Sequence, residues 1–399
     1  MIALVVIVQY FFYLKATRYF KSIHESAMLR RATKVVFILF NAPMVAMTVW
    51  RPDMSAVPPL VMSMGVYPFY VWHYSLILLF LFIVVGKILQ FPFISAAWFW
   101  QRVFRAGSGR RKNDSLMVDS GRRKLLGQGM VLLTGAIFAA TTIGIVRRNS
   151  WELSCVEIPT VNLPDEFSGF TICLLSDIHS SIFMTKGQMQ EYADAANELG
   201  TDLIVVTGDF VNSAVDEIYP FTEAFSRLSA PFGNFGVLGN HDYFARNIDI
   251  ISREVNSCGV RLLRNEHVIL ERKGKKVCLL GLDDVGNERT ARRFIDKAVA
   301  GTDHKIPKVL LCHRPYFFQQ AADRNIGLML SGHTHGGQIV FTQIGRDIIA
   351  PARMVSPYVA GLYSKGSSHM YVSRGIGTVG VPLRLNCPPE LTKITLVAA

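Results

Sequence analysis

The chain has 399 residues, a formal net charge of +12 and a positive mean hydropathy of +0.28. This length and hydropathy exclude a single soluble domain of ordinary size, so part of the chain must lie outside a globular core. The first 150 residues hold 18 Lys and Arg against 4 Asp and Glu, whereas the rest holds 24 against 26. The N-terminal cations alternate with long apolar runs, which favours loops beside membrane spans over a nucleic-acid surface.

Four apolar stretches in this basic part are candidate membrane spans. They are Ile2 to Leu14, Val35 to Trp50, Val66 to Leu89 and Leu125 to Val146. The last two reach the ~20 residues that a membrane-crossing helix usually needs, whereas the first two are short and need flanking residues. A Trp/Phe-rich extension follows the third stretch as far as Trp100. It is typical of an interfacial belt, and a fifth span is the alternative.

Loop charge predicts the orientation of these spans. Lys15 to Lys34 holds six Lys/Arg and Arg102 to Lys124 holds eight, whereas Arg51 to Leu60 holds one. Because positively charged loops stay in the cytoplasm, four spans place the remainder of the chain on the opposite side. Gly121 to Leu126 also resembles a twin-arginine export signal kept as an anchor, although an ordinary positive flank explains it equally well. The polar, basic linker Ala106 to Ser115 is predicted to be mobile.

From Trp151 onward the composition becomes that of a soluble α/β domain of about 250 residues. Short apolar runs predict buried strands at Phe170 to Leu175, Leu203 to Val206, Phe235 to Leu238, Val309 to Leu311 and Leu328 to Leu330. Polar helical stretches, Gly187 to Leu199 and Tyr219 to Leu228, separate the first of them. Two further runs, Val277 to Leu282 and Met370 to Ser373, predict a second sheet. The chain therefore divides into a transmembrane region, residues 1–150, and an α/β domain, residues 151–399.

Five motifs rich in metal-binding residue types follow five of these strands. They are Asp177-Ile-His179, Gly208-Asp209, Gly239-Asn240-His241-Asp242, Cys312-His313 and Gly332-His333-Thr-His335. Because function in an α/β sheet lies at the carboxyl ends of its strands, these side chains are expected to form one site. Carboxylate, imidazole and amide oxygen are ligands of hydrolytic divalent metals, and their number exceeds what one ion needs. The pattern indicates a two-metal phosphoester hydrolase.

The five motifs in this order resemble the calcineurin-like metallophosphoesterase superfamily, over about residues 170–396. The N-terminal spans make the chain similar to the membrane-anchored bacterial phosphodiesterases of that superfamily. The resemblance implies an α/β fold in which two β-sheets form a sandwich flanked by helices, preceded here by about four transmembrane helices. It also implies an integral protein of the bacterial inner membrane, and the loop charge predicts that its catalytic domain lies outside the cytoplasm.

The same resemblance assigns roles to single residues. Asp177, His179 and His335 are expected to hold one metal ion, Asn240, His313 and His333 a second, and Asp209 to bridge both. The expected ions are Mn²⁺, Zn²⁺ or Fe, with a hydroxide between them as the nucleophile. His241 cannot bind metal if its neighbour does, so it is expected to protonate the leaving oxygen, and Asp242 is expected to orient its ring.

Two weaker patterns concern an arginine and the cysteines. Arg374 follows a predicted strand in a glycine-rich segment and is a candidate phosphate contact, although a solvated turn fits the sequence equally well. Cys173, Cys278 and Cys312 lie inside apolar runs, which favours buried free thiols over disulfides. Strand alternation turns Cys312 away from the face of its neighbour His313, which makes it a poor candidate for a metal ligand.

Departures from the protein phosphatases of the superfamily narrow the substrate. Those enzymes continue the second motif with Asp-Arg-Gly and end the third with Glu, whereas here the second runs from Gly208 to Asn212 and the third ends in Asp242. A phosphodiester or pyrophosphate, for example a lipid headgroup, is therefore favoured over a phosphoprotein. One alternative is a cytosol-facing enzyme that cleaves the pyrophosphate of a nucleotide-linked acylated sugar. The other is a catalytically silent metal-binding or signalling domain on a membrane anchor.

Overall fold

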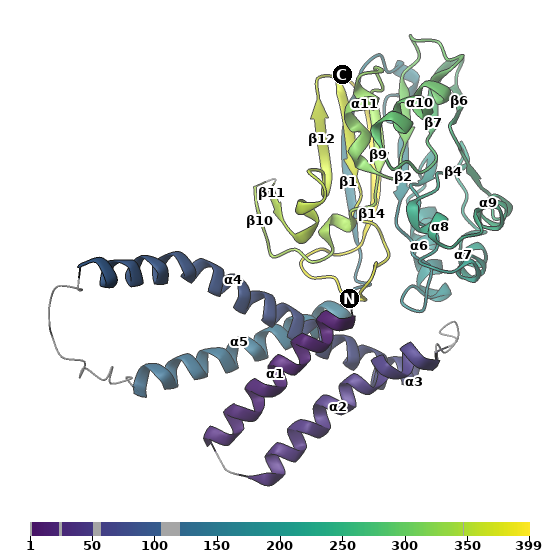
Figure 1. Cartoon of the computed structure of the whole chain (residues 1–399). Helices are drawn as coiled ribbons and strands as arrows, with labels where there is room; N and C mark the ends of the chain where they lie inside the picture. Colours follow the sequence, from purple (N-terminus) through teal and green to yellow (C-terminus); the bar gives the residue numbers. More distant parts are fainter. Residues whose placement is uncertain (1, 24–25, 51–56, 105–119, 346) are drawn as a thin grey trace. The chain divides into compact units, whose positions relative to one another are not determined.

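The computed structural model describes residues 2–23, 26–50, 57–104, 120–345 and 347–399 (Figure 1). The predicted linker, Ala106 to Ser115, and most of the loop Arg51 to Leu60 lie outside these residues. The chain divides into two compact units with a boundary between Ile145 and Val146. We refer to them as the helical unit and the C-terminal unit.

The helical unit contains long helices with exposed apolar surfaces. Its elements are α1 (Ile2–Ile23), α2 (Ala27–Trp50), α3 (Pro59–Val61), a π-helical turn (Met62–Val66), α4 (Tyr67–Phe104) and α5 (Ser120–Val146). Two stretches, Pro59–Trp100 and Leu125–Val146, are long and apolar enough to cross a membrane, and only 6% and 17% of their most apolar windows are buried. Because a water-soluble bundle would bury these side chains, their exposure favours a lipid surrounding.

The described residues thus show two candidate spans, where the sequence analysis expects about four. The two shorter apolar stretches do form helices, but charged residues occupy part of each helix. Lys15, Arg18 and Lys21 lie in α1, and Arg30, Arg31 and Lys34 lie in α2. These cations shorten the apolar length below that of the other two stretches. The Trp/Phe-rich extension continues α4 through Pro92 as one helix, so the described residues contain no separate fifth span there.

Two six-stranded sheets form the framework of the C-terminal unit. The first has the order β1 (Glu152–Thr160), β14 (Glu390–Ala398), β2 (Thr171–Leu175), β3 (Leu203–Val206), β4 (Asn234–Gly236), β5 (Val260–Leu262). The second has the order β12 (Gly361–Lys365), β13 (Ser368–Val372), β9 (Leu328–Ser331), β8 (Lys308–Leu311), β7 (Lys275–Gly281), β6 (Glu266–Arg272). Strands β2 to β5 run parallel, as do β7, β8, β9 and β13. All seven predicted strands are present, with bounds shifted by at most two residues.

Strand alternation explains why the predicted strands are continuously apolar. In β2, Ile172 and Leu174 pack in a core shared with Leu311 of β8, whereas Cys173 and Leu175 pack in a second core on the opposite face. That second core is covered by α6 (Lys186–Glu198), α7 (Ile218–Phe225) and α9 (Ile248–Ser257). On the outer face of the other sheet, α10 (Glu288–Val299) and α11 (Phe318–Ala322) cover a third core. The unit is therefore an α/β sandwich flanked by helices, as the sequence predicts.

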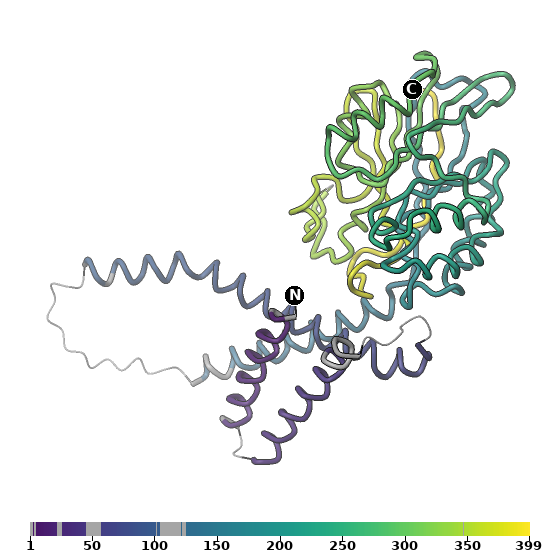
Figure 2. The backbone as a smooth tube through the Cα atoms, turned by 45° about the vertical axis from the view of Figure 1, so that its right-hand side comes forward, coloured from purple at the N-terminus to yellow at the C-terminus, as the bar shows by residue number. Residues whose placement is uncertain are grey.

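Short elements complete the unit. They are α8 (Asn240–Phe244), the hairpin β10 (Thr342–Ile344) and β11 (Asp347–Ile349), and 3₁₀ turns at Asp165–Phe167, Val215–Glu217, Pro315–Phe317, His335–Gly337 and Pro351–Met354. The β10–β11 hairpin projects from the side of the unit in both views (Figures 1 and 2). All six cysteines are free thiols, and Cys312 is buried in the third core.

Candidate metal centre

The candidate ligands come from both sheets, not from the edge of one. Asp177, Asp209 and Asn240 follow β2, β3 and β4 of the first sheet. His313 and His333 follow β8 and β9 of the second. Because the two sheets pack face to face, the carboxyl ends of these strands meet, and the site forms between the layers of the sandwich.

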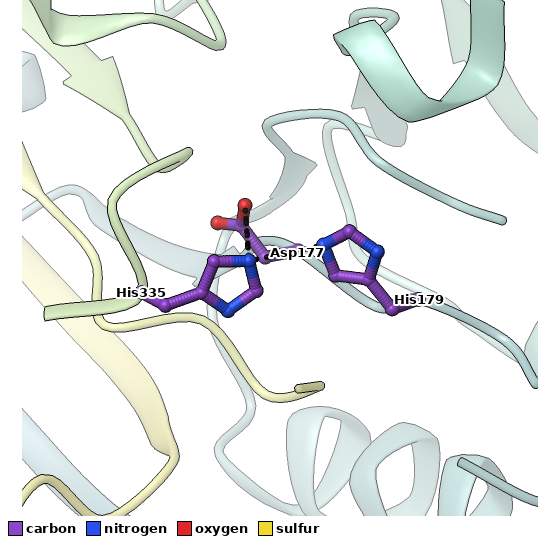
Figure 3. A group of neighbouring side chains, drawn as sticks. All are labelled: Asp177, His179 and His335. Atoms are coloured by element: carbon purple, nitrogen blue, oxygen red, sulfur yellow. Dashed lines mark hydrogen bonds and ion pairs between the residues drawn. The ribbon is translucent and has the colours of Figure 1, made fainter. Parts of the chain in front are cut away.

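Asp177, His179 and His335 form the first ligand group. Their donor atoms all lie within 4.8 Å of one another, and all three side chains are buried. The Nε2 atoms of the two histidines are 3.0 Å apart, and Nε2 of His335 is 3.5 Å from Oδ1 of Asp177. Figure 3 shows His335, on one segment of the chain, facing Asp177, which lies on a second segment together with His179. One cation can be held there by one oxygen and two nitrogen ligands.

The second ligand group contains Asp209, His313 and His333, again with donor atoms within 4.8 Å. Nε2 of His313 lies 3.2 Å from Oδ2 of Asp209 and 3.2 Å from Nδ1 of His333. The same nitrogen is 3.2 Å from Oδ1 of Asn240. The four residues therefore surround a second possible cation position.

The Asp209 carboxylate lies close to both ligand groups. Its Oδ2 atom faces His313 at 3.2 Å and also lies 3.5 Å from Nε2 of His179 in the first group. A backbone N–H from His241 occupies the other oxygen at 2.8 Å. The Asp209 carboxylate could therefore contribute a ligand to a cation held at either group.

Protonation preferences at the histidines suit metal binding. Burial lowers the pKa of His179 and of His333 to about 3, and lowers the pKa of His335 well below its usual value, so all three are neutral at pH 7. His313 differs because, although burial opposes its charge, the Asp209 carboxylate raises its pKa to about 10. Nδ1 of His313 donates to the Thr207 carbonyl at 2.7 Å, so a neutral ring points its Nε2 lone pair at Asp209. A cation between them relieves that repulsion, so the donor set fits a metal ion.

His241 and Asp242 have separate tasks. Nδ1 of His241 donates to the Asn212 carbonyl at 2.5 Å, which fixes the ring and leaves Nε2 available. The Asp242 carboxylate instead accepts backbone N–H bonds of 2.8–3.2 Å from four residues: Asp209, Phe210, Val211 and Gly239. The expectation that Asp242 orients the His241 ring therefore differs from the structure. Asp242 holds the backbone that carries Asp209, and Asn212 is a positioning residue that the sequence analysis did not identify.

Arg374 lies in an ion-pair network. Its Nε donates to Glu390 at 2.6 Å and its Nη2 to Glu152 at 3.2 Å, so carboxylates on β14 and β1 already neutralise its charge. A Cβ added to Gly336 would lie 2.7 Å from the Arg374 side chain, which shows that its stem packs beneath the loop of His335. The structure thus places Arg374 as a support for that loop and does not bring it into either ligand group.

The backbone at the site is held in a conformation that side chains rarely adopt. Five ligand residues have positive φ: Asp177 (52°), His179 (48°), Asp209 (56°), His333 (72°) and His335 (51°). Two glycines make room for the carboxylates, because a Cβ at Gly239 would lie 2.2 Å from Asp209 and one at Gly332 would lie 2.2 Å from Asp177. Such strain persists only where the surrounding structure enforces it, and it concentrates at functional sites.

Known proteins are similar to the C-terminal part of this chain. The family described as Calcineurin-like phosphoesterase matches residues 170–337. The Bacillus subtilis protein named Uncharacterized metallophosphoesterase YkuE is 33% identical over 290 residues, which cover 69% of this chain and 97% of that protein. Phosphodiesterase YaeI of Escherichia coli is 30% identical over 236 residues, which cover 58% of this chain and 84% of that protein. A zebrafish protein named Transmembrane protein with metallophosphoesterase domain is 32% identical over 256 residues, or 61% of this chain, and the chain spans 57% of its length.

Proposed function

Because the chain belongs to the calcineurin-like phosphoesterase family, we propose that its C-terminal unit is a binuclear metal-dependent phosphoesterase. The position of Asp209 between the two ligand groups carries this proposal, since one carboxylate oxygen faces His179 and His313. The proposed ligands are Asp177, His179 and His335 for one ion, Asn240, His313 and His333 for the other, and Asp209 for both. Two Mn²⁺, Zn²⁺ or Fe ions would polarise the phosphoryl oxygens and activate a water between them.

The protein's own groups then act on the leaving oxygen. With Nδ1 of His241 donating to Asn212, a protonated Nε2 can pass its proton to the oxygen that departs from phosphorus. His241 lies within reach of the first ligand group, since its ring centroid is 4.6 Å from that of His179. Asp242 positions the loop on which Asp209 stands.

We propose a phosphodiester or a pyrophosphate as the substrate, with a lipid headgroup as the preferred source. The name of the E. coli relative supports the diester, and the two candidate spans support a substrate at a membrane. The second candidate function, a silent metal-binding or signalling domain, would tolerate loss of ligands. All seven proposed ligands are present and face one another in two groups, which favours turnover.

Metal analysis tests the binuclear site. The full chain, purified in nanodiscs and supplied with Mn²⁺ or Zn²⁺, should retain two ions per chain and hydrolyse bis(nitrophenyl) phosphate. Chelation should abolish the hydrolysis and return of metal should restore it. At most one ion per chain in the metal-replete protein would refute the bridged site, and two ions without hydrolysis would favour the silent domain.

We further propose that the chain is an integral protein of the bacterial inner membrane, with its C-terminal unit outside the cytoplasm. Eight cations between Arg102 and Lys124 favour a cytoplasmic loop between α4 and α5, and α5 then leads outward whether or not α1 and α2 cross. A reporter that is active only outside the cytoplasm, fused after Ala399, should be active. Activity of a cytoplasm-only reporter instead would favour the nucleotide-sugar pyrophosphatase.

A further inference from the structure

A cavity of about 300 Å³ opens beside the metal-ligand groups. His333 and His335 line one part of it. The Tyr316 ring, whose centroid lies 5.4 Å from the centroid of the His333 ring, lines the same part. The remaining wall includes Ile339 and Val379. The cavity is therefore continuous with the place where a phosphate would be bound.

Three polar side chains in the wall, Thr334, Gln338 and Ser356, already form hydrogen bonds. Thr334 donates its hydroxyl to the Val359 carbonyl at 2.6 Å, and Ser356 donates to the Tyr358 carbonyl at 2.7 Å. The Gln338 amide is bonded through both of its ends, to the Val379 and Val381 carbonyls and to the Val379 N–H. These groups have little left to offer a ligand, so away from the two histidines and Tyr316 the wall behaves as apolar surface.

The other side of the cavity is a cap, which we define as residues 339–356 without residue 346. The cap is fixed to the ligand loop, since Val340, Ala350 and Cys387 form one small core and the Cys387 thiol donates to the His335 carbonyl. Pro351, Ala352 and Val355 of the cap line the cavity. The cap therefore places apolar walls at a fixed position relative to a metal ligand.

The outer surface of the cap carries several exposed apolar side chains beside the polar Thr342, Gln343, Asp347 and Arg353. Its exposed large apolar side chains are Phe341, Ile344, Ile349, Met354 and Val355, of which Met354 is 91% and Val355 75% exposed. Val355 both lines the cavity and lies on this surface, so apolar surface continues from the metal-ligand groups to the outside of the unit. Clustered exposed apolar side chains around a pocket mark a binding surface, and the same chain carries two candidate membrane spans.

We propose that the cavity holds one alkyl or acyl chain of an amphiphilic membrane phosphoester whose phosphate lies at the two ligand groups. This proposal rests on the proposed phosphoesterase function and names its substrate class. Water adds its oxygen to phosphorus, the bond from phosphorus to the leaving oxygen breaks, and the leaving oxygen takes a proton. The alkyl or acyl chain of the substrate then passes from the bilayer into the cavity over the cap surface.

Two nitrophenyl diesters that differ only in their second alcohol test the proposal. The full chain in nanodiscs is assayed with nitrophenyl octyl phosphate and with nitrophenyl ethyl phosphate, and the ratio of the two kcat/KM values is the readout. The octyl ester should be preferred roughly tenfold or more, as expected when several methylene groups leave water. Ala352→Trp, which fills the cavity, and Val355→Asp, which charges its mouth, should bring the ratio close to one.

Matched controls separate the cavity from general effects. Ile269→Asp charges an exposed apolar residue on edge strand β6, and Ala300→Trp adds the same bulk at an exposed position beyond α10. Both should keep the wild-type ratio, and partitioning into the nanodisc lipid is the same for every variant. A wild-type ratio of one, or a ratio that neither cavity variant changes, would overturn the alkyl-chain site and leave the phosphoesterase function standing.

A binding measurement tests the alkyl-chain site even if the proposed hydrolytic function is wrong. If two ions are bound but neither ester is cleaved, the hydrolytic function fails, and calorimetry with octyl phosphate and ethyl phosphate decides the cavity on its own, with empty nanodiscs as reference. If octyl phosphate binds more tightly than ethyl phosphate and Val355→Asp abolishes this difference, the proposed alkyl-chain site is supported. Equal binding of octyl phosphate and ethyl phosphate would refute the alkyl-chain site.

Discussion

The two units place polar and apolar side chains in opposite ways. In the C-terminal unit, apolar residues fill both faces of the central strands, and polar ones gather where the strands end. In the helical unit, large apolar side chains of α4 such as Phe82 and Ile88 are exposed, whereas Gln9 and His73 are buried. There Trp72 of α4 donates to the Gln9 side chain of α1 at 2.9 Å, and Asn41 of α2 donates to it at 3.4 Å.

The difference shows what each unit uses polar groups for. A helix surrounded by lipid gains little from burying apolar side chains, so hydrogen bonds between helices help to select their pairing. A sandwich in water is stabilised by its apolar cores, which leaves the strand ends available for chemistry. Changes at the proposed metal ligands should therefore affect rate far more than folding, and changes inside the helical unit should affect folding slightly and rate not at all.

Asp209→Asn should give the largest effect. It removes the bridging charge from both ligand groups, and an ion contributes several kcal/mol to the stabilisation of the transition state, so the rate should fall on the order of 10⁴-fold. Metal content, measured by elemental analysis, should fall below two ions per chain while the sandwich stays folded by circular dichroism. Unchanged metal content and rate would show that Asp209 bridges nothing.

His241→Ala should keep both ions and lose on the order of 10²–10⁴ in rate on esters with poor leaving groups. A nitrophenolate leaves without much help from a proton, so the same variant should be impaired much less on a nitrophenyl ester. The comparison needs steady-state rates on an alkyl and a nitrophenyl diester, together with metal analysis. Equal losses on both would point to stabilisation of phosphoryl charge, and loss of metal would make His241 a ligand.

Asp242→Asn should act on stability, because one amide oxygen replaces a carboxylate that accepts four backbone N–H bonds. Hydrogen bonds to a charged group contribute about 1.5–3 kcal/mol each, and we expect a loss of roughly 2–4 kcal/mol in the free energy of unfolding. Thermal unfolding of the C-terminal unit should show a midpoint lower by roughly 5–10 °C. Any loss of rate should be the same for good and poor leaving groups, unlike that of His241→Ala.

Gln9→Leu in the helical unit should have the smallest effect. Hydrogen bonds between membrane helices contribute about 0.6 kcal/mol each on average, and Nε2 of Gln9 has no partner among the described residues, so the net loss should stay below about 1 kcal/mol. Thermal unfolding in nanodiscs measures it, with metal content and hydrolysis unchanged. A marked fall in hydrolysis would mean that the two units are coupled and that the contrast between them is incomplete.

The sequence predicted the central strands well because each is buried on both faces. Runs such as Leu203 to Val206 are apolar at every position, and a ligand motif follows within three residues. It did not predict that the ligands come from two sheets, since β2 and β8 have the same local pattern and only tertiary packing separates them. The edge strands β1 and β6 mix charged and apolar residues, so no short apolar run marked them.

The role of each residue in the site was harder to predict than which residues belong to the site. Asp242 stands beside His241 in sequence, but the turn into α8 directs its carboxylate toward the backbone after β3. The partner of the His241 ring is a main-chain carbonyl, at Asn212, and side-chain patterns carry no signal for such a partner. The cavity was missed for a similar reason, because its walls come from four separate segments of the chain.

The left-handed backbone at five of the proposed ligand residues should affect how long the protein survives in a cell. Each such residue costs about 1–2 kcal/mol, so together they offset roughly 5–10 kcal/mol, which is comparable to the whole stability of an ordinary domain. Ions that bind only the folded chain add stability back in proportion to their concentration relative to the dissociation constant. Proteases act on chains that open, so copies made during metal starvation should be removed faster than loaded copies. The amount of the protein should thus follow the metal supply because of the strained turns, independently of its reaction rate.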